Sequence, residues 1–223
     1  MMSITRWAAA SLAVLALAQP AEAGSIPLFN TGVDAGGVPL AGGSDDPHWS
    51  IIAGPGITNP VPAVVLTSQF YVQSPDSVWV WRNASGQAGL DPFTFRLTFD
   101  LTGFDPTTAV ITGSWGVDNT GEILLNGQSG ASIGTGELSL PDVTGNNFYY
   151  FHDFTLNSGF VAGINTLDFV VDDAGSVGGL SVTNLVGAAA STAAPEPTSL
   201  VMLGVGAIGL MGYIRRCRKA SRA

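Results

Sequence analysis

Cysteine is almost absent from this 223-residue chain, and histidine is rare. The single cysteine, Cys217, lies close to the C-terminus, so the chain before it forms no internal disulfide and depends on its hydrophobic core for stability. The two histidines, His48 and His152, have no cysteine near them and make no zinc-binding pattern. The sequence also lacks the phosphate-binding P-loop, the GxSxG nucleophile motif and the HExxH zinc motif.

Basic residues are also scarce, and most of them lie at the two ends. The chain has eight Lys and Arg against 17 Asp and Glu. Between residues 24 and 194 only Arg82 and Arg96 accompany fifteen acids, which leaves this region at −13. Such a surface cannot neutralise phosphates, so nucleic-acid binding is excluded. Calcium or a neutral polysaccharide is a better match to this charge.

The N-terminal segment has the three parts of a secretory signal peptide. Arg6 supplies the positive charge, Trp7 to Ala18 forms the apolar stretch, and Ala21-Glu22-Ala23 is an A-x-A cleavage site. We therefore expect signal peptidase to recognise Ala21 and Ala23 as its cleavage site and to remove residues 1–23, so that the mature chain begins at Gly24.

The C-terminal segment combines a stiff acidic motif, an apolar stretch and a basic end. Pro195-Glu196-Pro197 is held extended by its prolines, and an uncharged stretch follows from Leu200 to Ile214. Arg215, Arg216, Arg218 and Lys219 come directly after it. This order predicts a transmembrane helix at about 198–214 with its C-terminal end in the cytoplasm.

These three parts together resemble the PEP-CTERM sorting signal. The resemblance spans Pro195 to Arg218. It implies that an exosortase in the inner membrane of a Gram-negative bacterium recognises and cleaves this segment. Before this cleavage the protein would be anchored transiently in the inner membrane, and afterwards it would reach the cell surface or the extracellular matrix. The sorting residues implied are Pro195, Glu196, Pro197, Arg215, Arg216 and Arg218.

Between the two ends, the pattern predicts short β-strands joined by Gly- and Pro-rich turns. The clearest strand alternates from Phe93 to Leu101, with the large apolar residues on one face. Asn126-Gly127 is typical of a type I′ hairpin turn. No stretch shows sustained helical periodicity, so we predict an all-β, antiparallel sandwich between the signal helix and the C-terminal transmembrane helix.

The predicted organisation is a signal peptide, one domain, a linker and a sorting segment. We place the β-sandwich at 24–186 and an Ala/Ser/Thr linker at 187–194. The sorting and anchor segment covers 195–219, and 220–223 forms a short tail.

The body resembles the galactose-binding-like jelly roll found in carbohydrate-binding modules and in sandwich domains of glycosidases. The residues that carry this resemblance are Phe95–Leu101, Asp118-Asn119, Ile123–Gly127, Phe154 and Gly163–Phe169. Because these motifs are structural and bind no ligand, the resemblance supports the fold more than the function. Jelly-roll modules often hold one structural Ca²⁺, so the resemblance also implies such an ion, without locating it.

Several loop residues are candidates for binding. Asp34, Asp45 and Asp46 offer oxygen ligands for Ca²⁺, with Asp172-Asp173 and Asp118-Asn119 as alternative donors. The competing interpretation is that these acids are solvated loop charges. Aromatic residues offer flat faces for sugar rings, and Trp115 beside Asp118 and Asn119 is the first candidate for ligand contact; core packing is the alternative. The other aromatic candidates are Trp79, Trp81, Tyr149 and Tyr150.

The sequence therefore predicts a secreted, non-enzymatic protein of the envelope or matrix, associated with exopolysaccharide and biofilm. The alternative is a carbohydrate-binding module or a carbohydrate-active enzyme. No cofactor other than the Ca²⁺ is expected. The expected partners are exosortase, signal peptidase, a polysaccharide and, before processing, the membrane.

Overall fold

The computed structural model describes most of the region between the two predicted processing segments and part of the C-terminal stretch. The described residues are 22–67, 70–87, 92–142, 144, 146–175, 177–192, 203–204, 206–212 and 214–215. Within them the body is built from strands and two short 3₁₀ helices.

The strands differ widely in length, from two residues to twelve. They are β1 (Ala23–Ile26), β2 (Asp45–Ala53), β3 (Val61–Val65), β4 (Val80–Trp81), β5 (Phe93–Asp100), β6 (Val110–Asp118), β7 (Thr120–Leu125), β8 (Gln128–Ser129), β9 (Gly134–Gly136), β10 (Ser139–Leu140), β11 (His152–Leu156), β12 (Ile164–Asp172) and β13 (Gly179–Ala190). The 3₁₀ helices are η1 (Pro106–Thr108) and η2 (Gly130–Ser132).

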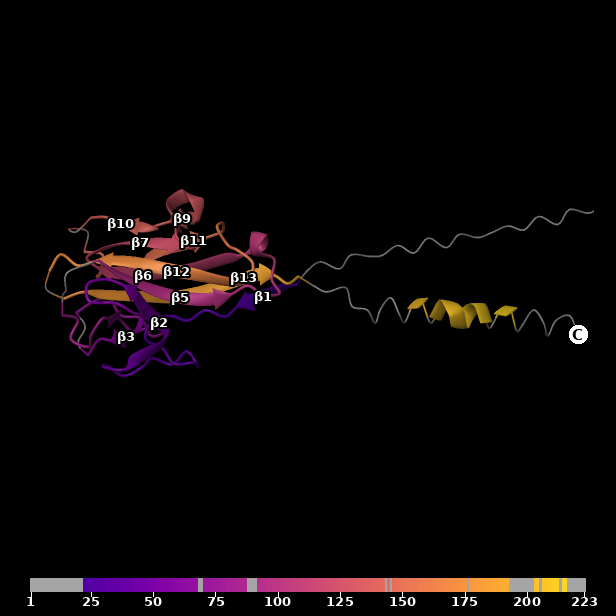
Figure 1. The fold of residues 1–223 in the computed structure, drawn as a ribbon, viewed down its shortest axis with the longest axis horizontal. Coiled ribbons are helices and arrows are strands. Elements are labelled where there is room, and N and C mark those ends of the chain that lie inside the picture. The colour runs from indigo at the N-terminus through magenta and orange to yellow at the C-terminus, as the bar shows by residue number, and fades with distance from the viewer. Residues whose placement is uncertain are drawn as a thin grey trace, which may run out of the picture.

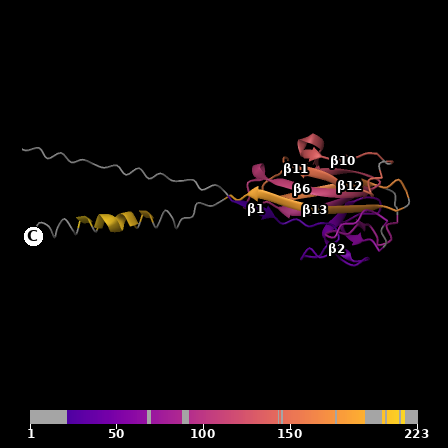
Figure 2. The ribbon, with the colours of Figure 1, turned by 180° about the vertical axis from the view of Figure 1, so that it is seen from behind.

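All of these strands belong to one antiparallel sheet that curls on itself (Figure 1). The order along the sheet is β10-β7-β12-β5-β2-β3-β4-β13-β6-β11-β9, with β1 beside β13 and β8 beside β7. The prediction of an all-β antiparallel fold is confirmed. The two layers of the sandwich are halves of this single sheet, because β3 and β4 lie in the middle of the strand order and join the half that contains β12 to the half that contains β13. Figure 2 shows β12, β13 and β6 from behind.

Large side chains from the inner faces fill the space between the halves. Strand β5 has the predicted alternation, since Phe93, Phe95, Leu97 and Phe99 are buried while the residues between them are more exposed. Phe169 of β12 contacts Trp115 of β6 across the core, with ring centroids 5.3 Å apart. The buried core residues all fall between Ile26 and Ala189, so residues of the body alone form the core of the described structure.

Each of the four tryptophans of the body is buried and has a partner for its indole N–H. Trp49 donates to the carbonyl of Phe29, Trp79 to Val72, Trp81 to Gln87 and Trp115 to Glu137, at 2.7–3.1 Å. A buried N–H without an acceptor would destabilise the fold, and these bonds remove that cost.

The motifs that resemble the galactose-binding-like fold form structural contacts. Asn126 and Gly127 have φ values of 52° and 77°, as a type I′ turn requires, and they join β7 to β8. The Asn126 amide donates to Asn165 Oδ1 at 2.8 Å and to the Gly159 carbonyl at 2.9 Å. On the outer face, Arg96 and Asp168 are paired across β5 and β12 by two hydrogen bonds of 2.7 Å.

The first and last residues of the body meet at one end of the sandwich. The Ser191 N–H donates to the Glu22 carbonyl at 3.0 Å, and β1 lies along the final part of β13. We call this end, with the turns at 101–108 and 161–164, the tail end. Residues 187–190 belong to β13, which corrects the predicted linker: their backbone groups pair with β1 and β6.

Parts of the predicted processing segments lie outside the described residues. These are most of the signal peptide, including Ala21, and the sorting residues Pro195, Glu196, Pro197, Arg216 and Arg218. Ala23 is described and begins β1. Residues 203–204, 206–212 and 214–215 are helical, and apolar side chains such as Ile208 are exposed. No described helix is long and apolar enough to cross a membrane, so the span at about 198–214 stays a prediction.

We predict that Phe95→Ala lowers the free energy of unfolding by about 3–5 kcal/mol, because it removes a fully buried ring from the core. Thr98→Ala, on the exposed face of the same strand, should change it by less than about 0.5 kcal/mol. Urea denaturation of residues 24–192 measures both values, and similar losses for the two variants would contradict the assignment of the faces.

Candidate functional site

The end of the sandwich opposite the tail end is formed by the turns that follow β6 and β12. Asp118 pairs with Gly179, and Asp172 pairs with Thr120, so residues 118–120, 172–175 and 177–179 lie at the same end. We call this the loop end. Residues 70–73 and 146–150 also belong to it, because the Val72 N–H donates to the Phe148 carbonyl at 2.8 Å and Val117 donates to Asn147.

The buried side chain of Tyr71 contacts three of these segments. Its hydroxyl donates to Asp118 Oδ2 at 3.0 Å and also lies 3.1 Å from the Val177 carbonyl oxygen. Its ring packs against Trp79 and against Phe148, with centroid distances of 4.3 and 5.7 Å. Burial raises the pKa of Tyr71 above its usual value, so the hydroxyl stays protonated and can donate.

Two buried carboxylates at the loop end have an oxygen without a partner. Asp118 and Asp173 are each 8% exposed. In the part of the chain that the structure describes, Asp118 Oδ1 and Asp173 Oδ2 are buried and accept no hydrogen bond. The other oxygen of Asp173 accepts the N–H of Gly175 at 3.0 Å. Desolvated carboxylates with free lone pairs are unfavourable and mark this place as a candidate site.

The electrostatics of Asp118 follow from this burial. Loss of solvent raises the pKa of Asp118 to about 6. The hydrogen bond from Tyr71 opposes this change, and the negative charge of Asp173 adds to it. Burial likewise raises the pKa of Asp173. Both groups therefore favour a proton or a cation more strongly than an exposed aspartate does.

Asn119, which the sequence suggests as a ligand contact, holds the loops together. Its N–H donates to the Asp172 carbonyl at 3.1 Å, and its side-chain oxygen accepts the Ala174 N–H at 2.7 Å. Its carbonyl accepts the Asn147 amide at 2.7 Å. The peptide bond between Asp118 and Asn119 is cis. Asn119 thus fixes the position of the neighbouring carboxylates.

The aromatic candidates divide into buried and exposed groups. Trp115 is fully buried, as are Trp79 and Trp81, and a core residue cannot stack on a ligand at the surface. This corrects the prediction of Trp115 as a ligand contact. Tyr149 and Tyr150 are 53% and 66% exposed at the loop end. Phe70, which the sequence does not single out, is 85% exposed on the segment that is bonded to theirs through Val72 and Phe148.

The acids of the first loop do not form the predicted metal cage. Asp34 Oδ1 accepts the N–H groups of Gly36 and Val38, which closes a local turn. Asp46 is buried, and both of its oxygens accept backbone N–H groups, those of Gly32, His48 and Trp49. Asp45 is exposed. No group of three or more potential ligand side chains occurs among the described residues.

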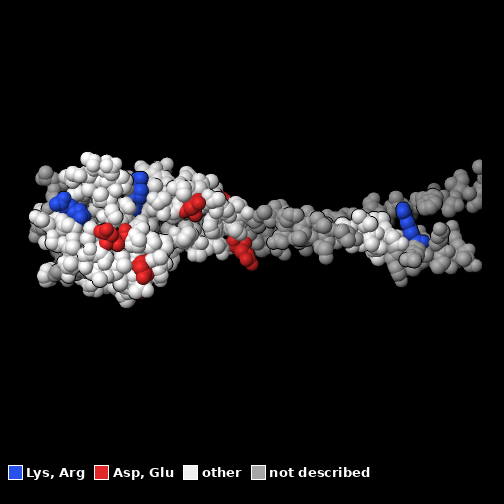
Figure 3. All heavy atoms as spheres, turned by 60° about the horizontal axis from the view of Figure 1, so that its bottom comes forward, with Lys and Arg blue, Asp and Glu red and all other residues white. Residues whose placement is uncertain are grey.

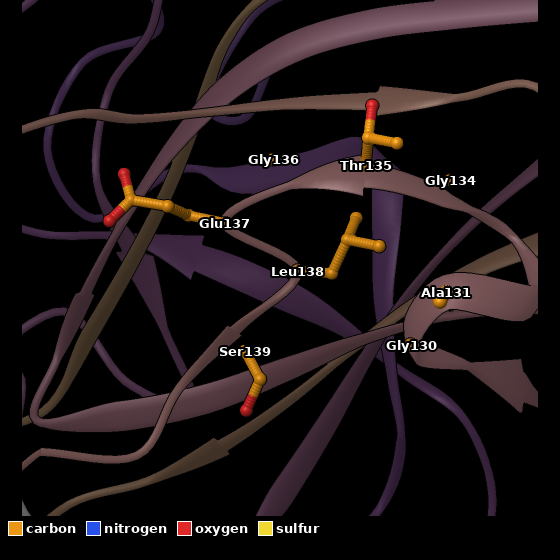
Figure 4. A pocket seen from close by; sticks show the side chains of 8 residues that line it. All are labelled: Gly130, Ala131, Gly134, Thr135, Gly136, Glu137, Leu138 and Ser139. Atoms are coloured by element: carbon orange, nitrogen blue, oxygen red, sulfur yellow. The ribbon is translucent and has the colours of Figure 1, made fainter.

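An open depression lies on a different part of the body, between η2 and β10. Its volume is about 560 Å³, and it is lined mainly by small residues (Figure 4). Glu137 is the ionisable side chain in this lining, and it bonds His152 Nδ1 at 2.9 Å. One exposed carboxylate beside a histidine offers no facing pair of acids for glycoside hydrolysis.

Comparison with known proteins identifies the C-terminal segment. Residues 193–219 match the PEP-CTERM protein-sorting motif. The tail of this chain is a PEP-CTERM sorting motif. It contains the sorting residues named from the sequence and indicates a secreted protein that is exported and sorted by an exosortase, as in Gram-negative bacteria.

The body has a distant structural neighbour. It is a crystal structure of an apo-form cyclase from Fischerella sp., with 14% identity and a TM-score of 0.43 over 77% of this chain and 98% of that chain. At this level the likeness does not extend to activity. The comparison with curated proteins gave no significant match.

We predict that the metal-free body becomes more stable as the pH falls from about 7 towards about 5. The pKa of Asp118 is raised on folding, so around pH 5 the folded protein holds a proton that the unfolded chain has released. This stabilisation is complete below the unfolded value, near 4, and is lost as the pH rises through about 6. Asp46 and Asp173, whose pKa values are also raised, act in the same direction.

The contribution of Asp118 is isolated by Asp118→Asn. Thermal unfolding of both proteins in EDTA should show a smaller change of Tm with pH for the variant. Equal pH dependence in the two proteins would contradict the assignment to Asp118.

Proposed function

We propose that this PEP-CTERM protein is a non-enzymatic, polysaccharide-binding protein of the cell envelope or extracellular matrix. In this proposal the C-terminal segment holds it briefly in the inner membrane until exosortase cleavage releases it. The observation that carries the binding function is the group of exposed aromatic side chains at the loop end. We call these three residues, Phe70, Tyr149 and Tyr150, the aromatic group.

Exposed aromatic rings in a water-soluble body favour a ligand with apolar faces. Each ring leaves a large apolar area in contact with water, which binding would remove. Sugar rings have such faces on their C–H sides, and their hydroxyls can bond the tyrosine hydroxyls and nearby loop groups. Backbone contacts between 70–73 and 146–150 hold the aromatic group on well-anchored segments.

The charges of the body favour a neutral polymer over an acidic one. Arg96 is engaged by Asp168, and Arg82 lies over the Phe93 ring at 5.8 Å. Residues 24–194 contain no further Arg or Lys. Figure 3 shows a face of the body that is largely uncharged, with a few isolated acidic and basic side chains. An anionic polysaccharide would therefore meet repulsion and few counter-charges.

The two ends of the body suit a protein that is tethered at one end and binds at the other. The sorting motif follows the tail end, where Ser191 contacts Glu22. The aromatic group is at the loop end, where β6 ends and β13 begins, and β1 and the last part of β13 lie at the opposite end of these strands. A protein held through its tail would thus present the aromatic group away from the membrane.

Binding is tested with Tyr149→Ser combined with Tyr150→Ser. We expect the double variant to bind neutral polysaccharides roughly 30-fold more weakly, since two stacking faces worth about 1 kcal/mol each are lost. Affinity electrophoresis of residues 24–192 in gels containing neutral glucans, galactans or mannans measures this.

The matched control is Ile164→Ser, which removes an apolar side chain that is 61% exposed at the tail end. It should bind as the wild type does. Equal retardation of all three proteins in every gel, or equal weakening by the control, would contradict a binding role for the aromatic group.

The processing of the chain gives a separate prediction. Protein recovered from the medium of an exosortase-containing host should begin at Gly24 and end near Pro195–Pro197, because both segments are cleaved. Intact-mass spectrometry measures both ends, and deletion of the exosortase should leave the C-terminal segment attached. Released protein that still carries Arg215–Ala223 would contradict the sorting step.

A further inference from the structure

The two unpartnered carboxylates at the loop end lie on segments that are bonded to each other. Asp118 ends β6 and Asp173 follows β12. Asn119 joins these segments through its bonds to the Asp172 carbonyl and the Ala174 N–H, at 3.1 and 2.7 Å. Tyr71 joins Asp118 to the Val177 carbonyl from the other side. The same loops therefore hold both acids.

This arrangement is incomplete as a protein-only structure. Asp118 and Asp173 are more than nine-tenths buried, and within the described residues Asp118 Oδ1 and Asp173 Oδ2 have no donor. Buried carboxylates are normally paired with a cation or satisfied by donors, because an unpaired charge in a desolvated place is strongly unfavourable. A bound cation would compensate both oxygens together.

We propose that Asp118 and Asp173 bind one Ca²⁺ ion, with backbone carbonyls of residues 172–175 and 177–178 and water completing its oxygen ligands. The donors favour calcium because they are oxygens on irregular loops, and calcium accepts six to eight oxygens in flexible geometry. Magnesium requires near-ideal octahedral geometry, and zinc prefers the nitrogen and sulfur ligands that these loops lack.

Two carboxylates predict a weak site of the kind found in extracellular modules. We expect a dissociation constant of about 0.1–1 mM, since affinity rises with the number of charged ligands. The −13 charge of the body attracts divalent cations and adds to the occupancy. The ion would hold residues 118–120 and 172–175 together and, through Tyr71, support the neighbouring segment at Phe148. This inference is independent of the polysaccharide proposal.

The test is a calcium titration of residues 24–192 after EDTA treatment, followed by calorimetry and by thermal unfolding. Ca²⁺ should bind with a stoichiometry of about one and raise Tm more than Mg²⁺ does at equal ionic strength. Asp118→Asn and Asp173→Asn should each weaken binding by more than about tenfold, because each removes one of two charged ligands. These isosteric changes relieve buried charge, so both variants should fold.

Terbium provides a second readout that does not depend on stability. Tb³⁺ replaces Ca²⁺ at oxygen sites, and Tyr71 and Trp79 lie at the proposed site as energy donors. Excitation of the aromatic rings should therefore produce terbium emission that Ca²⁺ displaces and that both Asn variants lose.

The control variant is Asp76→Asn, which removes the same charge from an exposed position elsewhere. It should keep calcium binding and terbium emission, as should the double variant of Tyr149 and Tyr150. Equal Tm shifts with Mg²⁺ and Ca²⁺, or calcium binding that survives both Asp118→Asn and Asp173→Asn, would overturn the proposal. Loss of calcium binding in Asp76→Asn to the same degree would also overturn it, since only general charge would then matter.

Discussion

The two halves of the curled sheet are held together by aromatic packing in the core, and Phe169 lies at its centre. This residue lies on β12 and packs against Trp115 of β6, Trp49 of β2 and Phe154 of β11, at centroid distances of 5.3–6.1 Å. The body has no cysteine, so this aromatic packing takes the place that disulfides hold in many small exported domains. Closing the sheet in this way also fixes where each strand ends, and therefore which loops meet.

The register of the long strands produces two different ends. At the tail end, Glu22 and Ser191 are bonded, so both processing segments join the body at one place. At the loop end, turns from distant parts of the sequence converge on Tyr71 and Asp118. The long strands of the sheet lie between these two ends. They therefore keep the sorting segment at the tail apart from any ligand bound at the loop end.

The sequence was sufficient for the parts of the fold that depend on local patterns. The period of two from Phe93 to Leu101 predicted the buried face of β5, and Asn126-Gly127 predicted the β7–β8 turn correctly. The sorting motif was recognisable because its three parts are contiguous. The end of β13 was misplaced, since small alanines in a strand look the same as a linker until β1 pairs with them.

The candidate site was harder to predict because burial decides it. Trp115 and Tyr149 are both aromatic residues next to polar ones in the sequence, yet one is in the core and the other is exposed. Asp46 and Asp173 likewise look alike as loop acids. Only the fold shows that Asp46 accepts three backbone N–H groups while Asp173 keeps a free oxygen. Tyr71 joins the loops in the structure, but no motif in the sequence around it indicates this role.

A comparison of the buried carboxylates shows why the loop end differs from the rest of the body. Asp168 is satisfied by Arg96, and Asp46 by backbone donors, so in both places the fold compensates the charge it buries. Asp118 and Asp173 are buried to a similar degree but lack that compensation in the described residues. Among the described residues, the other buried side-chain atoms without a partner are Nε2 of His48 and of His152, so Asp118 and Asp173 are the only buried carboxylates that keep an oxygen without a donor. These two carboxylates therefore depart from the rule that a fold compensates the charges it buries. Such departures are typical of functional sites, where a ligand supplies the missing interaction.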